Sequence, residues 1–363
     1  MFQTAKSKLV TSDDVEETYL QNSRKKTLII ITLAVLTAIA AVCSLFITQL
    51  STLTPSEVIA VLISHLTGEP VTNIAFEIAI WEYNVPRMLL GLIVGSTLAI
   101  GGALMQCILR NPLATPYTTG VSAGASMGAA MFIFLDFAII STGGYLSTIA
   151  INAMVFAMIP TAAILLVSNL KHITPTTMIL AGVAMMYVFN AASTLLMLLA
   201  APDDVQQSYE WNIGALGRAS WDNIWYVLAG TIPCMIILTL MSRQIHMMNA
   251  GGRSALTMGV NVKMVRNVTL LVIAVMTAIT VSITGGIGFI GLVSSHVARI
   301  IVGSNMKHLL PCSALLGALI LLVADGVSRI IVMGGVPVGV LTAVVGGPVF
   351  IAILIKSAKK AWF

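Results

Sequence analysis

Long apolar stretches recur along the chain and are separated by short polar or charged segments. The first of them, residues 27–47, contains no charged side chain. About twenty consecutive apolar residues can cross the hydrocarbon layer of a bilayer as an α-helix. The pattern predicts an all-α integral membrane protein with about ten transmembrane helices, at residues 27–47, 88–108, 118–137, 148–168, 177–200, 223–241, 265–284, 290–303, 309–329 and 338–356. The boundaries around residues 284–303 are the least distinct.

Lysine and arginine are distributed unevenly between the two ends of these predicted helices. Cytoplasmic loops of membrane proteins carry an excess of both residues. Only Arg87, Arg218 and Arg329 fall at the ends opposite the termini. The basic residues on the side of the termini are Arg24, Lys25, Lys26, Arg110, Lys171, Arg243, Arg253, Lys263, Arg266, Arg299, Lys307, Lys356, Lys359 and Lys360. We therefore expect both termini to be cytoplasmic.

The first 26 residues are polar and mixed in charge, which predicts a cytoplasmic N-terminal tail. A secretory signal has a short apolar core and a small-residue cleavage site. Here the apolar segment is full length, so we expect a retained first helix rather than a cleaved signal. Residues 27–363 then form one transmembrane domain. Its longest inner loop, residues 242–262, is expected to hold a short helix.

Composition agrees with a lipid-exposed protein. Of the 363 residues, 58% are hydrophobic and 9% are charged, whereas about a quarter are charged in soluble domains. The four cysteines lie in apolar runs and the five histidines are scattered, so neither a disulfide framework nor a metal site is predicted. The nucleotide-binding motif G-x-x-x-x-G-K-[ST] does not occur. If ATP drives this protein, another chain hydrolyses it.

Three blocks of motifs follow one another between about residue 75 and the C-terminus. The first block contains Pro86-Arg87, Gly101–Gln106, Arg110–Ala114 and Gly120–Ala125. The second contains Gly285–Leu292, His296, Arg299 and Leu309-Leu310-Pro311. The third contains Leu322, Ala324-Asp325, Arg329, Pro337–Ala343, Gly346, Pro348 and Phe350. In order and spacing these blocks resemble the iron–siderophore and vitamin B12 permease family of ABC importers, the FecCD type.

The resemblance implies a ten-helix subunit of type II ABC importer architecture without catalytic chemistry of its own. It also implies three kinds of partner: a second permease subunit, identical or homologous, two cytoplasmic ATPase subunits that use ATP, and an extracytoplasmic substrate-binding protein. No cofactor on this chain is implied. The solute path would follow the subunit interface, lined largely by residues 177–200. The expected solute is a ferric siderophore, an Fe(III) chelate, with vitamin B12 and haem as alternatives. The expected location is the bacterial cytoplasmic (inner) membrane.

The resemblance further assigns residues at the cytoplasmic side. The inner gate carries over to Asn111, Leu113 and Thr176, although the Asn111-Pro112 sequence is equally typical of a plain turn. The loop that docks on the ATPase corresponds to Arg253, Ala255, Leu256, Met258, Gly259, Val260 and Asn261.

On the outer face, the resemblance implies that arginines pair with carboxylates of the binding protein. Arg87 and Arg329 match family positions, and Arg218 is a further candidate. The alternative is that these side chains extend to the membrane interface without docking. Asp325 lies four residues before Arg329, so the two can pair on one helix face.

The sequence departs from the family pattern at several positions. Asn84 replaces an arginine before the second span, which puts one docking pair in question. Gly252 and Arg253 replace acidic residues of the docking loop, and Gly286 and Ser295 replace prolines. An ion-coupled secondary transporter is the distant alternative, but it needs carboxylates within the membrane, and the predicted spans offer little beyond Asp325.

Overall fold

The structure is a computed structural model that describes residues 12–47, 54–68, 73–170, 174–249, 251–331 and 335–358, and every regular element in these ranges is a helix. In chain order the elements are α1 (Ser12–Phe46), α2 (Pro55–Thr67), α3 (Ile74–Glu77), the π-helix η1 (Ile78–Asn84), α4 (Val85–Ile108), the 3-10 helix η2 (Tyr117–Thr119), α5 (Val121–Leu135), α6 (Tyr145–Ser168), α7 (Pro175–Leu199), α8 (Pro202–Asn212), α9 (Trp221–Met248), α10 (Gly252–Thr257), α11 (Val262–Thr284), α12 (Ile290–Val302), α13 (Met306–Ile331) and α14 (Val338–Ala358).

Each of the ten predicted segments overlaps one of these helices. Within the described residues, seven helical runs are long and apolar enough to cross a membrane, and α5, α12 and α14 supply shorter apolar helices. The indistinct stretch around residues 284–303 is explained by its backbone. Gly285 and Phe289 both have positive φ angles, of 71° and 65°, so the chain leaves the helix after Thr284 and starts α12 at Ile290.

The stretches between the predicted spans 27–47 and 88–108, and between 177–200 and 223–241, contain further helices that the sequence did not predict. Residues 48–87 contain α2, α3 and η1, and residues 201–222 contain α8. These helices are too short or too polar to resemble spans. The π-helical turn η1 leads directly into α4 and widens the helix just before Pro86. A proline lacks its N–H and clashes with the preceding turn of an α-helix, so the wider turn lets one helical run continue from Ile74 to Ile108.

The centre of the bundle is formed by α4, which packs against α13, α12, α11 and α9. Glycines allow the closest approaches. A Cβ added to Gly95 would lie 2.5 Å from the backbone oxygen of Gly317 on α13, and one added to Gly102 would collide with Gly291 on α12. Close backbone approach through small residues is the usual packing mode of membrane helices. Gly95 and Gly102 therefore allow α4 to pack closely against α13 and α12.

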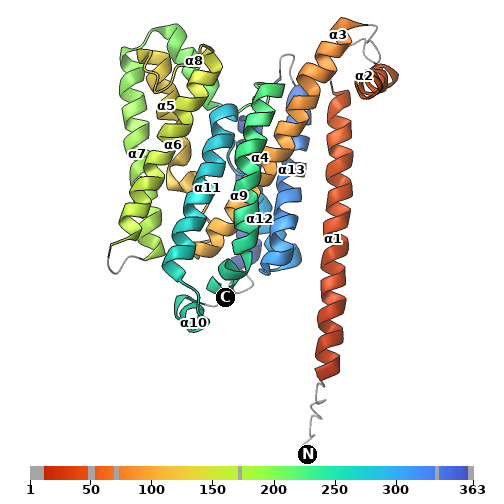
Figure 1. The fold of residues 1–363 in the computed structure, drawn as a ribbon, viewed down its shortest axis with the longest axis vertical. Coiled ribbons are helices and arrows are strands. Elements are labelled where there is room, and N and C mark those ends of the chain that lie inside the picture. The colour runs from red at the N-terminus through yellow and green to blue at the C-terminus, as the bar shows by residue number, and fades with distance from the viewer. Residues whose placement is uncertain are drawn as a thin grey trace, which may run out of the picture.

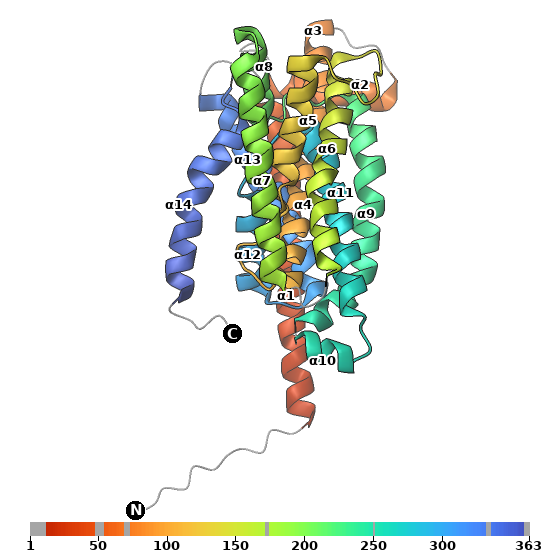
Figure 2. The same ribbon diagram turned by 90° about the vertical axis from the view of Figure 1, so that its left-hand side faces the viewer.

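The helices at the edge of the bundle are much less buried than those at its centre. In the most apolar window of α7, 11% of residues are buried, against 72% in the window of α11. Figure 2 shows α7 at the surface and α14 lying beside the main body of the bundle. Figure 1 shows α1 standing along the opposite edge. These exposed apolar helices need lipid or another protein chain around them.

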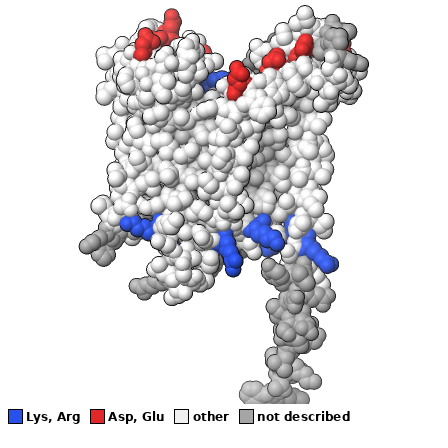
Figure 3. All heavy atoms as spheres, in the orientation of Figure 1, with Lys and Arg blue, Asp and Glu red and all other residues white. Residues whose placement is uncertain are grey.

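Charge is divided between the two ends of the bundle (Figure 3). Lysine and arginine form a band at the end where α1 begins and α14 ends, which we term the basic end. Aspartate and glutamate gather at the other end, termed the acidic end, over α2, α3, η1, α8 and the start of α9. The helix α1 starts at Ser12, so residues 12–26 of the predicted N-terminal tail are helical.

Candidate functional site

A buried carboxylate holds two arginines together at the acidic end. Asp325 of α13 is 2% exposed. It accepts hydrogen bonds from Arg87 of α4, with Nη2 at 2.8 Å and Nε at 3.0 Å, and Arg329 Nε lies 3.2 Å from Oδ2 of the same carboxylate. The predicted pair between Asp325 and Arg329 is therefore confirmed. Arg87 adds a second ion pair that joins two central helices.

The Arg329 side chain also binds the C-terminal end of α1. Its Nη1 donates to the Ile47 carbonyl at 2.8 Å and to Asn84 Oδ1 at 3.1 Å, and its Nη2 donates to the Ser44 carbonyl at 3.0 Å. Carbonyls at a helix C-terminus have no partner within the helix and carry partial negative charge. Only 7% of the Arg329 side chain is exposed, against 24% for Arg87. Arg329 is thus occupied by contacts within the chain.

Arg218 lies in the loop between α8 and α9 and binds the end of α8. Its Nη2 donates to the Glu210 carbonyl at 2.6 Å and its Nη1 to the Trp211 carbonyl at 3.4 Å. Burial lowers the pKa of the Arg218 guanidinium from its ordinary value, and the charge of Glu210 opposes this shift. The side chain remains half-buried, so part of it faces the acidic end.

At the basic end, the predicted docking loop is shorter than residues 242–262, because α9 continues to Met248. The short helix α10 projects from this end (Figure 1). It closes with a Schellman motif: Val260 N donates to the Ala255 carbonyl at 3.0 Å and Gly259 N to the Leu256 carbonyl at 3.0 Å. Gly259 has a φ of 80°, which glycine adopts without steric cost. The expected short helix is therefore present.

Two apolar side chains are exposed on α10 and directly after it. Leu256 is 60% exposed and Met258 is 48% exposed, whereas Ala255 and Val260 are buried beneath them. Asn261 begins α11 and accepts a hydrogen bond from Met264 N at 3.0 Å. The side chain of Arg253 lies outside the described part of the structure. Exposed apolar residues on a projecting helix are typical of a protein contact surface.

The predicted gate residues also lie at the basic end. Residues Arg110–Ala114, termed the gate turn, follow α4 and are closed by two hydrogen bonds. Asn111 Oδ1 accepts from Leu113 N at 2.9 Å, and the Asn111 carbonyl accepts from Ala114 N at 3.0 Å. Leu113 is 46% exposed, and Thr176 at the start of α7 is exposed as well. The turn is thus observed, and its role as a gate stays a prediction.

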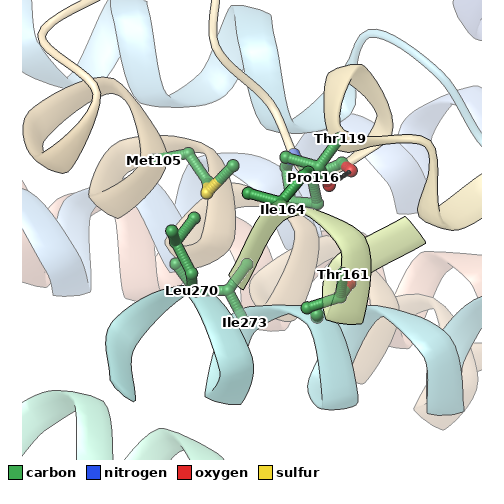
Figure 4. A pocket seen from close by; sticks show the side chains of 8 residues that line it. Met105, Pro116, Thr119, Thr161, Ile164, Leu270 and Ile273 are labelled. Atoms are coloured by element: carbon green, nitrogen blue, oxygen red, sulfur yellow. Dashed lines mark hydrogen bonds between the residues drawn. The ribbon is translucent and has the colours of Figure 1, made fainter. Parts of the chain in front are cut away.

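A small cavity lies between α4, η2, α6 and α11 (Figure 4). Its volume is about 10 Å³, enough for roughly one water molecule. Thr161 Oγ1 is buried there without a hydrogen-bond partner. The lining residues are Met105, Pro116, Thr119, Thr161, Ile164, Leu270, Ile273 and Ala274. A metal chelate does not fit this cavity.

A larger groove of about 320 Å³ opens between α12, α13 and α14. Its walls are almost entirely apolar, and Thr342 is the single lining residue with a hydroxyl group. Such a surface suits lipid or a packed helix better than a charged solute. Together with the low burial of α7, it leaves two apolar faces of the bundle uncovered.

Known proteins are similar to this chain in sequence and in architecture. The model of the FecCD transport family matches residues 35–356. The chain belongs to this family. Among its relatives, MJ0087 of Methanocaldococcus jannaschii, described as an ABC transporter permease protein, is 36% identical over 360 residues, which cover 96% of this chain and 99% of MJ0087. The hemin transport system permease protein HmuU of Yersinia pestis is 32% identical over 291 residues, which cover 77% of this chain and 84% of HmuU.

Two further comparisons extend the FecCD relationship. The vitamin B12 import system permease protein BtuC of Salmonella typhi is 33% identical, covering 78% of this chain and 85% of BtuC. A solved structure described as an inward-facing conformation of a metal-chelate type ABC transporter superposes with a TM-score of 0.79 at 27% identity, covering 91% of this chain and 99% of its own. The resemblance inferred from the three sequence blocks is therefore confirmed.

Two contacts in this FecCD chain could not be derived from its sequence. Arg87 and Asp325 are 238 residues apart, and no local pattern pairs them. One signal in the sequence could have indicated the pair. Asp325 is nearly the only acidic residue within the predicted spans, and a buried carboxylate needs a basic partner. The second contact is the hydrogen bond from Arg110 Nη2 to the carbonyl of Met248, the last residue of α9. Among the described residues, no group of three or more His, Cys, Asp or Glu side chains is placed to hold a metal ion.

Removing the charge of Asp325 is expected to destabilise the bundle strongly. Asp325→Asn leaves the guanidiniums of Arg87 and Arg329 without their carboxylate, and breaking a buried ion pair typically costs about 3–5 kcal/mol. The measurement is the unfolding of the purified protein in detergent. Asp222→Asn, an exposed aspartate at the same end, is the matched control. Equal stability of the two variants would contradict the structural role of Asp325.

Proposed function

We propose that this chain is the permease subunit of an ABC importer that carries a ferric siderophore across the cytoplasmic membrane. The match to the FecCD family over residues 35–356 carries this proposal. The chain performs no catalysis itself, and separate ATPase subunits hydrolyse ATP. Relatives named for Fe(3+)-citrate, hydroxamate, hemin and vitamin B12 transport support a bulky chelate as the solute. Vitamin B12 or haem is the alternative cargo of the same architecture.

The solute path lies between this chain and a second permease subunit. Support comes from size and exposure: the cavity inside the chain holds about 10 Å³, whereas the predicted path helix α7 is largely uncovered. Two chains placed with their α7 helices facing each other enclose a path that one chain cannot form. Asn111, Leu113 and Thr176 then stand at its basic end and form the inner gate.

The basic end faces the cytoplasm, and α10 docks on the ATPase subunits. The excess of lysine and arginine at this end (Figure 3) supports the orientation, with ten spans and both termini inside. The apolar side chains of Leu256 and Met258 form the contact, and Gly259 shapes the end of α10. Arg253, Ala255, Val260 and Asn261 complete the docking loop. The substrate-binding protein approaches the opposite, acidic end.

Arg87 and Arg218 are the arginines we assign to docking of the binding protein. Both keep part of the side chain exposed, and charge pairs at a rim raise the association rate. Arg329, whose side chain is mostly buried, holds Asp325 and thereby Arg87 in place. The three outer arginines thus have different tasks in this proposal.

Uptake of labelled solutes tests the transport function. Cells lacking the chain are compared with complemented cells, using ferric catecholate and hydroxamate siderophores, ferric citrate, haemin and vitamin B12. We expect uptake of one iron chelate to fall to background and to return with the intact chain. Loss of haemin or vitamin B12 uptake alone would select the alternative cargo. Uptake that persists without ATP and stops when the proton gradient collapses would instead indicate a secondary transporter.

Gly259→Arg is expected to abolish uptake while leaving the amount of protein in the membrane unchanged. The substitution places a bulky cation at a backbone φ of 80° on the docking loop. Gly68→Arg is the matched control, because Gly68 has a φ of 76° and open space around it at the acidic end. Uptake is measured beside the membrane level of each variant. If both variants transport equally well, α10 is not the docking element.

Arg218→Gln is expected to slow association of the binding protein severalfold at low ionic strength, and to weaken the dependence of the rate on salt. Arg218 suits this test better than Arg87, because its loss leaves the Asp325 ion pairs intact. The control Lys307→Gln removes the same charge at the basic end. Association rates of detergent-purified complexes with the binding protein provide the measurement. Identical rates for both variants would exclude Arg218 from the docking surface.

A further inference from the structure

Arg110 links the gate turn to the helix that enters the docking loop. It follows α4 at the basic end, and its Nη2 donates a hydrogen bond to the carbonyl oxygen of Met248 at 3.0 Å. Met248 is the last residue of α9. A Cβ built on Gly251, which directly precedes α10, would lie 3.6 Å from the same nitrogen. One guanidinium is therefore bonded to the end of α9 and lies beside the residue that precedes α10.

A second side chain strengthens this connection. Cys107 lies in the last turn of α4 and also contacts the end of α9. The Cys107 thiol lies 2.9 Å from Asn249 Oδ1 and 3.4 Å from the Ile245 carbonyl. Thiols are weak donors, so the charged Arg110 bond is the stronger of the contacts. The side chains of Cys107 and Arg110 thus connect the end of α4 to the end of α9.

The backbone of Arg110 is held in an unusual conformation. Its φ is 48°, a left-handed value that side chains other than Asn and Asp rarely adopt. Such conformations persist only where the surroundings enforce them, and they cluster at switch regions. Here the left-handed residue both ends α4 and turns the chain into Asn111. The same residue thus sets the direction of the gate turn and contacts α9.

The electrostatic surroundings favour this acceptor. All three ion pairs formed among the described residues involve Glu77 or Asp325, which lie at the acidic end. Arg266 of α11 interacts electrostatically with Arg110 and carries a charge of like sign. A helix C-terminal carbonyl with partial negative charge is then the natural partner of the guanidinium.

We propose that Arg110 is a coupling residue that transmits movement of the docking loop to the gate turn. The inference rests on the proposed function. Only residues 249–251 separate α10 from the end of α9. Displacement of α10 by the ATPase subunits therefore moves the end of α9. Arg110 passes this movement to Asn111 and Leu113. Its side chain is bonded to the end of α9, and its backbone begins the gate turn.

The first test measures how much solute is transported for each ATP hydrolysed. The complex is isolated through a tag on this chain and reconstituted in vesicles, with the iron chelate that wild-type cells take up as the probe. Arg110→Ala is expected to lower the ratio about tenfold, the size of a typical coupling between sites, while subunit composition and ATP hydrolysis are kept. Arg110→Lys, which retains a donor, is expected to recover part of it. Arg243→Ala, an exposed arginine of α9, is the matched control.

A second readout needs no solute. The Leu113→Cys variant is labelled with a thiol reagent in the nucleotide-free and the ATP-vanadate states of the complex. The exposed Cys43 is removed by Cys43→Ser. The labelling rate is expected to differ between the states in the wild-type background and to become equal in Arg110→Ala. A difference that survives in Arg110→Ala would overturn the coupling role. So would a parallel fall of uptake and hydrolysis, which would indicate lost assembly. If the wild-type complex itself shows no ATP-driven uptake, the proposed function fails, and this inference fails with it.

Discussion

The arrangement of the bundle depends on how it neutralises guanidinium groups in a low-dielectric interior. At the acidic end, Asp325 is shared between Arg87 and Arg329. One carboxylate cannot balance two cations, and an unbalanced buried charge is strongly unfavourable. The remaining compensation comes from backbone carbonyls of Ser44 and Ile47 at the end of α1. The C-terminal end of α1 is therefore an electrostatic part of the core as well as a lipid-facing span.

At the basic end, two described arginines are held by backbone and hydroxyl oxygens. Arg110 donates to the carbonyl of Met248, and Arg299 donates to that of Ala103 and to Ser304 Oγ. The Met248 carbonyl lies at the C-terminus of α9, where a helix carries partial negative charge, so it can hold a guanidinium without an acidic partner. This solution leaves the basic end free to carry a net positive charge. The two ends of the bundle thus differ in charge but share the use of helix termini as counterions.

The sequence predicted the elements that depend on local pattern, and it missed those that depend on distant contacts. Each of the ten segments predicted from apolar length overlaps a helix, and the short helix expected within residues 242–262 is α10. The helices α2 and α8 were missed because they are short or polar and have no span-like signature. Asn84 looked like a lost docking arginine, yet its amide donates to the Leu45 carbonyl at 3.1 Å and accepts from Arg329. Such roles require the folded chain, because the partners are far apart in sequence.

Among the described residues, neither the internal cavity nor the outer groove forms a polar site for a chelate. The cavity among α4, α6 and α11 has room for about one water, and the larger groove beside α14 is apolar. A binding site that distinguishes polar solutes needs convergent hydrogen-bonding groups within a concave surface. The exposed face of α7 offers one wall of such a site at most. In the proposed assembly, a second permease chain supplies the other wall and a binding protein delivers the solute, so substrate specificity is shared among the subunits.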